Sequence, residues 1–389
     1  MEINQKIPLW RDDRVWKVIL QAIAVIIVII AIAWLSVNFQ TNLERLNIPF
    51  GFEFLSFRAS FDIGETPIEY TASDTFARAL FVGFLNSLRV TLAGLILTTL
   101  IGITVGIARL SDNWLVNRLA LVYVEILRNT PLLLQLLFWY LAIFISAGKE
   151  GMRTFPASIY LSNAGLSLPW FKGTSATVIW LVILLGGIIG AIFLWRWRTK
   201  VRIEQGKAGY EWLFSLGAIA FSAILAILIT QRPPFDLNLP QLIGENQISG
   251  GLRLSPEYAA LVIGLSLYTA AFIAEIVRAG IQSVPKGQWE AAKSLGLTPN
   301  LTMRLVIFPQ ALRVIIPPLN NQYLNLWKNS SLAIAVGYPD IYSIASTTFS
   351  QTSKAVEVML IISLTYLSVS LIISFTMNLF NKAIQLQER

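Results

Sequence analysis

Residues 90–108 read VTLAGLILTTLIGITVGIA, a run of 19 residues without a charged side chain. The hydrocarbon core of a bilayer is about 30 Å thick, and roughly 20 apolar residues in a helix cross it. The run therefore predicts a membrane-spanning helix. The whole chain agrees, because 55% of its residues are hydrophobic and only 13% are charged, about half the charged share of ordinary globular chains. Too little polar surface remains to cover a water-soluble fold.

Further apolar stretches extend this prediction to an all-α, polytopic membrane helical bundle of about eight transmembrane helices. The third and seventh spans are the least purely apolar, because Glu125, Arg128, Asn321, Asn325 and Lys328 interrupt them. The predicted spans are Val18–Ser36, Phe84–Ala108, Val122–Ser146, Ala176–Trp195, Leu213–Thr230, Tyr258–Ile281, Leu312–Val336 and Val356–Phe380. The segments Val37–Ala79 and Gln231–Glu257 are expected to be caps on the outer surface, the first ordered and both irregular.

Basic residues concentrate in alternate connections between the spans. The clearest group is Arg196, Arg198, Lys200, Arg202 and Lys207, between the fourth and fifth spans. Cytoplasmic loops carry the excess of Lys and Arg, so this pattern predicts that both termini are cytoplasmic. An alternative for the first span is a cleaved secretory signal, but bulky Trp34 and Leu35 follow its small residues and favour retention.

Composition also excludes several classes of function. The chain has no cysteine and no histidine, which removes disulfides, zinc sites and catalysis by either residue. It lacks the G-x4-G-K-[ST] phosphate loop, so it has no ATPase site of that kind. We therefore assign no catalytic residue, no metal ligand and no cofactor to this chain. The basic residues are scattered, so we expect no nucleic-acid partner.

The connection before the seventh span reads VPKGQWEAAKSLGLTPNLTMRLVIFP from Val284 to Pro309. It predicts two short helices separated by a break at Gly296, which suits a left-handed C-terminal cap. Thr298 is expected to cap the second helix and Pro299 to occupy its first position. Pro309 predicts a turn or kink before the span.

This stretch resembles the EAA signature of permease subunits in bacterial ABC importers. The resemblance rests on Glu290-Ala291-Ala292, Gly296 and Pro309, while Val306 and Phe308 depart conservatively from the usual Ile-x-Leu-Pro ending. It implies a type I importer core of five helices. By the same resemblance, Glu290, Ala291, Ala292, Gly296 and Pro309 couple the chain to a separate ATPase.

Three other stretches are similar to the polar amino-acid permease branch of that family: Asn86–Thr91, Val124–Gln135 and Leu326–Leu332. The first span and an insert fall outside the five-helix core. The predicted parts are 1–79, 80–147, the insert 148–250 with two extra spans, and 251–389 with the coupling loop 283–310. This enlargement resembles permeases of general or neutral L-amino-acid importers.

Polar residues within spans usually face a cavity or a partner. In the seventh span Asn321, Asn325 and Lys328 or Asn329 recur at helical spacing, after Pro317-Pro318, which should kink the start of the helix. The stripe predicts either a substrate pathway or hydrogen bonds between helices. The full set of candidate pathway residues is Gln135, Asn321, Asn325, Lys328, Asn329 and Ser331.

Glu125 and Arg128 lie three residues apart, so they share a helix face and predict either a salt bridge or a gate or subunit contact. Glu275, near the inner end of its span, is a further candidate for a gate or an anchor. Pro131 is expected to break or kink the third span. Two small-residue pairs, Gly102-x3-Gly106 and Gly186-x3-Gly190, predict close packing between helices.

The function predicted is a permease subunit that imports amino acids by alternating access. The resemblance implies these partners: a cytoplasmic ATPase dimer holding ATP and Mg, a second permease subunit, an extracytoplasmic amino-acid-binding protein, and membrane lipid. The second permease subunit is either a homologous chain, which the insert favours, or a second copy of this chain. Its place is the bacterial inner membrane. The alternative is an ion-gradient-driven secondary transporter or channel, which favours acidic midplane residues and repeated halves.

Overall fold

The computed structural model describes residues 13–45, 49–146, 153–162, 164–206, 210–243 and 247–385. The predicted basic residue Lys207, the first predicted insert residue Gly148 and both ends of the chain lie outside these ranges. Within them, seven helices are long and apolar enough to cross a membrane, and a bent helix pair makes an eighth candidate. The predicted all-α membrane bundle of about eight spans is therefore confirmed.

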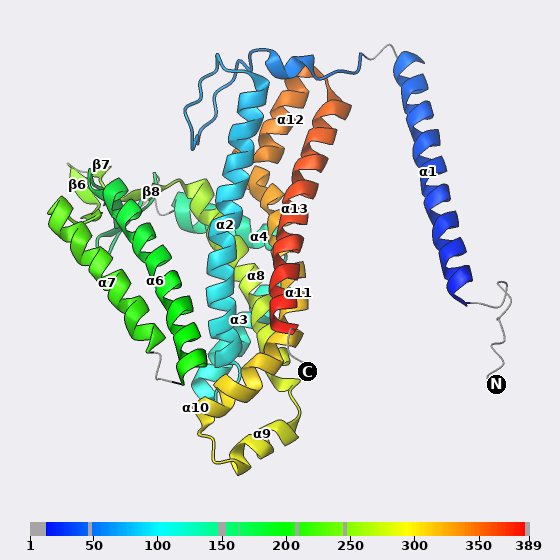
Figure 1. The fold of residues 1–389 in the computed structure, drawn as a ribbon. Coiled ribbons are helices and arrows are strands. Elements are labelled where there is room, and N and C mark those ends of the chain that lie inside the picture. Colours follow the sequence, from blue (N-terminus) through cyan, green and yellow to red (C-terminus); the bar gives the residue numbers. More distant parts are fainter. Residues whose placement is uncertain are drawn as a thin grey trace, which may run out of the picture.

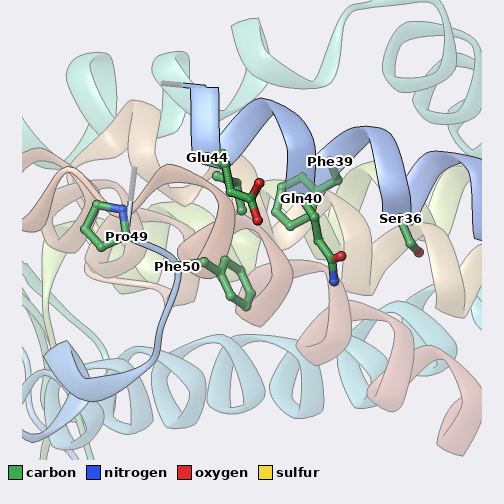
Figure 2. A pocket seen from close by; sticks show the side chains of 7 residues that line it. Ser36, Phe39, Gln40, Glu44, Pro49 and Phe50 are labelled. Carbon is green, nitrogen blue, oxygen red and sulfur yellow. The ribbon is translucent and has the colours of Figure 1, made fainter. Parts of the chain in front are cut away.

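The first helix, α1 (Asp13–Arg45), stands apart from the bundle (Figure 1). None of its most apolar window is buried against the protein, as expected for a helix surrounded by lipid. It runs nine residues beyond the predicted end at Ser36, so part of the predicted outer loop is helical. Figure 2 shows Phe39 and Gln40 of α1 beside Pro49 and Phe50, around an open pocket of about 750 Å³.

The bundle is built around the pair α2 (Phe76–Ala108) and α8 (Pro256–Gln282). On α8 lie α3 (Trp114–Asn129), α4 (Leu132–Leu137), the π-helix η3 (Phe138–Ile145) and α11 (Phe308–Asn329). The 3-10 helix η5 (Ser330–Val336), α12 (Ile341–Thr352) and α13 (Ala355–Gln385) complete it. We call the end that carries α12 the outer end and the opposite end, with α9 and α10, the inner end (Figure 1).

The outer end is closed by residues 49–75, which include the short 3-10 helix η2 (Glu53–Ser56). Phe54, Ala59 and Ile63 are buried against α2, α12 and α13 in one apolar cluster. Glu65 forms a 3.0 Å ion pair with Arg89 of α2 and accepts a 2.6 Å hydrogen bond from Ser255. Residues 49–75 are therefore ordered and packed on this end of the bundle, and the side of the membrane on which this end lies stays a prediction.

The segment between η3 and α8 contains two long helices, α6 (Thr177–Gln205) and α7 (Glu211–Thr230), which pack on each other. Short antiparallel strands cover their outer ends, so the prediction of an irregular cap over 231–257 was wrong. One sheet has the order β1-β2-β3-β8, and β4 pairs with β5 and β6 with β7. The strands are β1 (Arg153–Phe155), β2 (Ile159–Ser162), β3 (Gly165–Leu168), β4 (Trp170–Gly173), β5 (Phe235–Asn238), β6 (Gln241–Ile243), β7 (Gln247–Ser249) and β8 (Leu252–Leu254).

The two predicted glycine pairs, one on α2 and one on α6, differ in how closely other helices approach them. A Cβ atom added at Gly102 or Gly106 would lie 2.6 Å or 2.8 Å from atoms of α8, so these glycines allow α2 and α8 to pack closely, as predicted. A Cβ added at Gly186 or Gly190 meets nothing within 4 Å. The prediction that this second pair packs against another helix is wrong within the described chain.

This contrast gives a matched test. We expect Gly106→Ala to lower the free energy of unfolding by about 1–3 kcal/mol, because the added methyl group overpacks the α2–α8 contact. Gly190→Ala, in open space on α6, should leave it unchanged or raise it by up to about 1 kcal/mol, because alanine favours a helix more than glycine does. Thermal unfolding in one detergent measures both. Equal midpoints for the two variants would contradict the close contact.

Candidate functional site

The connection between α8 and α11 forms a compact loop at the inner end. It contains α9 (Lys286–Ser294), α10 (Pro299–Thr302) and the π-helical turn η4 (Met303–Ile307). The predicted pair of short helices with a break between them is confirmed. Glu290 and Ala291 are exposed, whereas Ala292 is 2% exposed and faces inward.

The break between the helices has a definite geometry. Gly296 has φ +76°, its amide donates to the Lys293 carbonyl at 3.0 Å, and the Leu297 amide donates to the Ala292 carbonyl at 3.1 Å. These are the two bonds of a Schellman cap, so the left-handed cap predicted at Gly296 is confirmed. Pro299 begins α10 as predicted. Thr298 occupies the capping position, but its side chain makes no capping hydrogen bond.

Pro309 lies in the first turn of α11 rather than in a separate turn. The π-helical turn η4 leads directly into α11, and the Phe308 amide donates to Met303 across it. A proline is tolerated here because a first-turn residue needs no hydrogen-bond donor. The predicted turn before the seventh span is therefore replaced by a widened helical turn. Pro317 and Pro318 also lie inside α11, which continues through both.

The loop is packed onto the membrane helices. Val284 and Ile307 are buried with Ile273 and Val277 of α8 and with Ile315 of α11 in one apolar cluster, which Trp289 and Met303 extend. The loop also contains a pocket of about 400 Å³, which is lined by Trp289, Glu290, Lys293, Leu297, Pro299 and Thr302. Leu295, at the tip, is 80% exposed.

The polar stripe predicted on the seventh span lies on α11. Asn321, Asn325 and Lys328 are exposed in this chain, while Leu326 and Trp327 are fully buried on the opposite side. Lys328 makes no ion pair with any residue that the structure describes. Charged and amide side chains in a span face a cavity or another subunit rather than lipid. We therefore expect this face of α11 to meet a cavity or another subunit.

The last two candidates on this span lie on either side of a change in helix type. Asn329 is the last residue of α11, four residues after Asn325 and on the same helix face, and it is half-buried. The chain then continues as the 3-10 helix η5, in which the Ser331 hydroxyl donates to the Lys328 carbonyl at 2.9 Å. The α-helical periodicity of the stripe therefore ends before Ser331.

The third predicted span is broken, as Pro131 suggested. The helices 114–129 and 132–145 meet at 108°. Gln135 is buried, and its amide nitrogen donates to the Leu127 carbonyl at 2.9 Å and the Thr130 carbonyl at 3.1 Å. It thus satisfies carbonyl groups freed at the end of α3. Because α4 packs against η5, the break lies beside the end of α11.

Glu125 and Glu275, two carboxylates toward the inner end of the bundle, have different surroundings. Glu125 accepts a 3.0 Å hydrogen bond from Asn129, and the Arg128 guanidinium lies 5.2 Å from the centre of the Phe272 ring. The salt bridge that spacing suggested between Glu125 and Arg128 is therefore not formed. Glu275 accepts hydrogen bonds from Arg278 at 3.1 Å and lies 3.5 Å from Arg109.

Arg109, at the end of α2, was not among the sequence candidates. It joins Glu275 of α8 only because α2 and α8 pack side by side, and no local pattern signals that contact. Thr130 was missed as well. It is both an acceptor for Gln135 at 2.7 Å and a donor to the Ile126 carbonyl at 2.9 Å.

Together the fold and these surfaces define a polytopic membrane transport protein with a polar face inside the membrane and a helical contact loop at one end. A comparison of sequences gives the family. Residues 257–386 match the family described as "Binding-protein-dependent transport system inner membrane component". The chain belongs to this family, because relatives align with it over nearly its whole length. The resemblance to ABC-importer permeases predicted from the EAA signature is thereby confirmed.

Three curated relatives are informative. The general L-amino acid transport system permease protein AapQ of Rhizobium johnstonii is 41% identical over 97% of this chain and 94% of its own length. The putative amino-acid ABC transporter permease protein YhdX of Escherichia coli is 42% identical, over 97% and 95%. The glutamate/glutamine/aspartate/asparagine transport system permease protein BztB of Rhodobacter capsulatus is 41% identical, over 97% and 96%.

The role of Gln135 at the break can be tested directly. We expect Gln135→Leu to lower the free energy of unfolding by about 1–3 kcal/mol, because two main-chain carbonyls lose their donor. The same substitution at exposed Gln40 of α1 should have little effect. Thermal denaturation of both purified variants measures the difference, and an unchanged midpoint for Gln135→Leu would show that the break holds without this amide.

Proposed function

We propose that this chain is the permease subunit of an ABC importer that moves amino acids into the cell by alternating access. The observation that carries the proposal is the exposed stripe of Asn321, Asn325 and Lys328 on a membrane-spanning helix. Such a stripe is stable only against water or a polar partner. The names of the three relatives support amino acids as the substrate class.

The chemistry of the stripe fits a zwitterion. Lys328 and the side-chain amides of Asn321 and Asn325 donate hydrogen bonds to a carboxylate, and the amide oxygens accept from an ammonium group. Asn329 and Ser331 extend the donor set at the end of α11. Glu125 and Arg128 line the neighbouring break as a gate or subunit contact, and Gln135 fixes the shape of that break. Glu275 anchors the inner end through its arginines.

One chain leaves the polar face of α11 open, so a second permease subunit has to cover it. The α6–α7 insert of this chain favours a homologous second subunit over an identical one. A separate extracytoplasmic binding protein delivers the amino acid at the outer end. Both termini are cytoplasmic in this arrangement, because the loop that carries α9 faces the ATPase.

The coupling loop is the contact for that ATPase, which binds ATP and Mg. Exposed Glu290 pairs with a basic residue of the ATPase, Leu295 enters an apolar pocket there, and Ala291 permits close approach. Ala292, Gly296 and Pro309 maintain the shape of the loop. The apolar cluster that joins Trp289 and Ile307 to α8 and α11 supports transmission of motion from the loop to the polar face.

Reversing the charge at Glu290 tests the coupling. Glu290→Lys should reduce co-purification of the ATPase at least tenfold and abolish ATP-dependent uptake, because two like charges then meet at the contact. Glu204→Lys, an equal change at an exposed position of α6, should leave both unchanged. Pull-down and uptake in proteoliposomes measure the effect. Normal uptake by Glu290→Lys would disprove a coupling role for this residue.

Removing an amide from the polar face tests the pathway. Asn325→Leu should reduce uptake at least tenfold, because the pathway loses a hydrogen-bonding group. Assembly with the partner subunits should persist, because the substitution removes no buried contact. Asn325→Gln, which keeps the amide, should retain part of the activity. If Asn325→Leu transports amino acids at the wild-type rate, the stripe serves only subunit packing.

A further inference from the structure

The inner half of the α6–α7 hairpin contains a groove that transport does not explain. It has a volume of about 280 Å³ and is lined mainly by Ile188, Ala191, Ile192, Trp195 and Arg196 of α6 and by Ile219 of α7. The lining is apolar along most of its length and ends in one guanidinium group. An acyl chain with an anionic headgroup matches these walls, because it is apolar along its length and carries its charge at one end.

Arg196 differs from the other basic residues of this hairpin. Arg202 forms a 3.1 Å ion pair with Glu211, Lys200 lies 3.7 Å from Glu204, and the Arg198 guanidinium lies 4.1 Å from the centre of the Phe214 ring. In the described parts of the chain Arg196 has no ion pair. Its charge is available to an anion at the end of the groove.

The expected depth of Arg196 in the membrane corresponds to the level of lipid headgroups. Nineteen residues separate Thr177, which begins α6, from Arg196. At 1.5 Å per residue they span about 28 Å, close to the thickness of the hydrocarbon core. Trp195 and Trp197 flank the arginine, as aromatic residues do at a membrane interface. Arg196 therefore lies at the level of lipid phosphates, with the groove extending from it into the hydrocarbon.

The hairpin is basic around this position. Residues 195–212 contain five basic and two acidic residues. The hairpin's inner end lies on the same side of the molecule as α9 and α10 (Figure 1). Basic groups next to spans attract anionic headgroups and contribute about fivefold in binding for each charge.

We propose that the α6–α7 groove is a binding site for an anionic phospholipid. One acyl chain lies along Ile188, Ala191 and Ile192 between the two helices, and the phosphate contacts Arg196. Such a lipid covers apolar surface that the rest of the bundle leaves open, since α6 and α7 pack mainly on each other. The site lies outside the polar face of α11 and outside the coupling loop.

Native mass spectrometry of the full chain, purified in detergent with its co-expressed partner subunits, tests the proposal. Phosphatidylglycerol, phosphatidylcholine and inorganic phosphate are titrated separately. We expect phosphatidylglycerol adducts at lower concentration than phosphatidylcholine adducts, and none with inorganic phosphate. Arg196→Gln should weaken phosphatidylglycerol binding about fivefold. Lys172→Gln, which removes one positive charge from exposed strand β4 of the same insert, is the matched control and should not weaken it.

A second variant tests the groove without changing charge. Ile188→Trp places a larger side chain in the groove and should weaken phosphatidylglycerol binding at least as much as Arg196→Gln. Equal binding of both lipids, or an unchanged affinity in both groove variants, would overturn the proposal. Binding of inorganic phosphate that Arg196→Gln abolishes would also overturn it, because Arg196 would then be a simple anion site.

Discussion

Hydrocarbon offers no hydrogen bonds, so each main-chain amide and carbonyl of a membrane span needs a partner inside the protein. This constraint explains the features that first look irregular. The third span breaks at Pro131, and buried Gln135 supplies donors to the freed carbonyls. Before Pro309 the seventh span passes through a π-helical turn, in which the Phe308 amide donates to the Met303 carbonyl. At these two departures from α-helix, main-chain groups find partners within the protein.

The same constraint distinguishes charged groups that are paired within the chain from those that have no partner among the described residues. Glu275 is engaged by Arg109 and Arg278, so its charge is compensated within the chain. Lys328 has no such partner among the described residues and lies on an exposed face of α11. The ion pairs of Glu275 join the inner ends of α2 and α8. Lys328 instead presents a cation to whatever covers α11.

Packing joins that face to the coupling loop. The glycines of α2 let α8 approach closely, and α8 in turn packs against α11 and the loop. The loop is therefore joined to α8 and α11 through a close-packed apolar cluster rather than through a flexible linker. The α6–α7 hairpin lies outside this cluster. Its packing leaves both helices largely exposed, which suits contact with lipid rather than transmission of motion.

The sequence alone determined the membrane bundle, the approximate spans and the two-helix loop, because span length, hydropathy and the residues Gly296 and Pro299 act locally. It also placed Asn321, Asn325 and Lys328 on one helix face through their spacing. Only the tertiary structure decided that Gln135 bonds across a break, that Arg109 reaches Glu275, and that Gly102 is packed while Gly186 is open. These outcomes depend on which helix becomes the neighbour, and residue spacing within one helix carries no information about that choice.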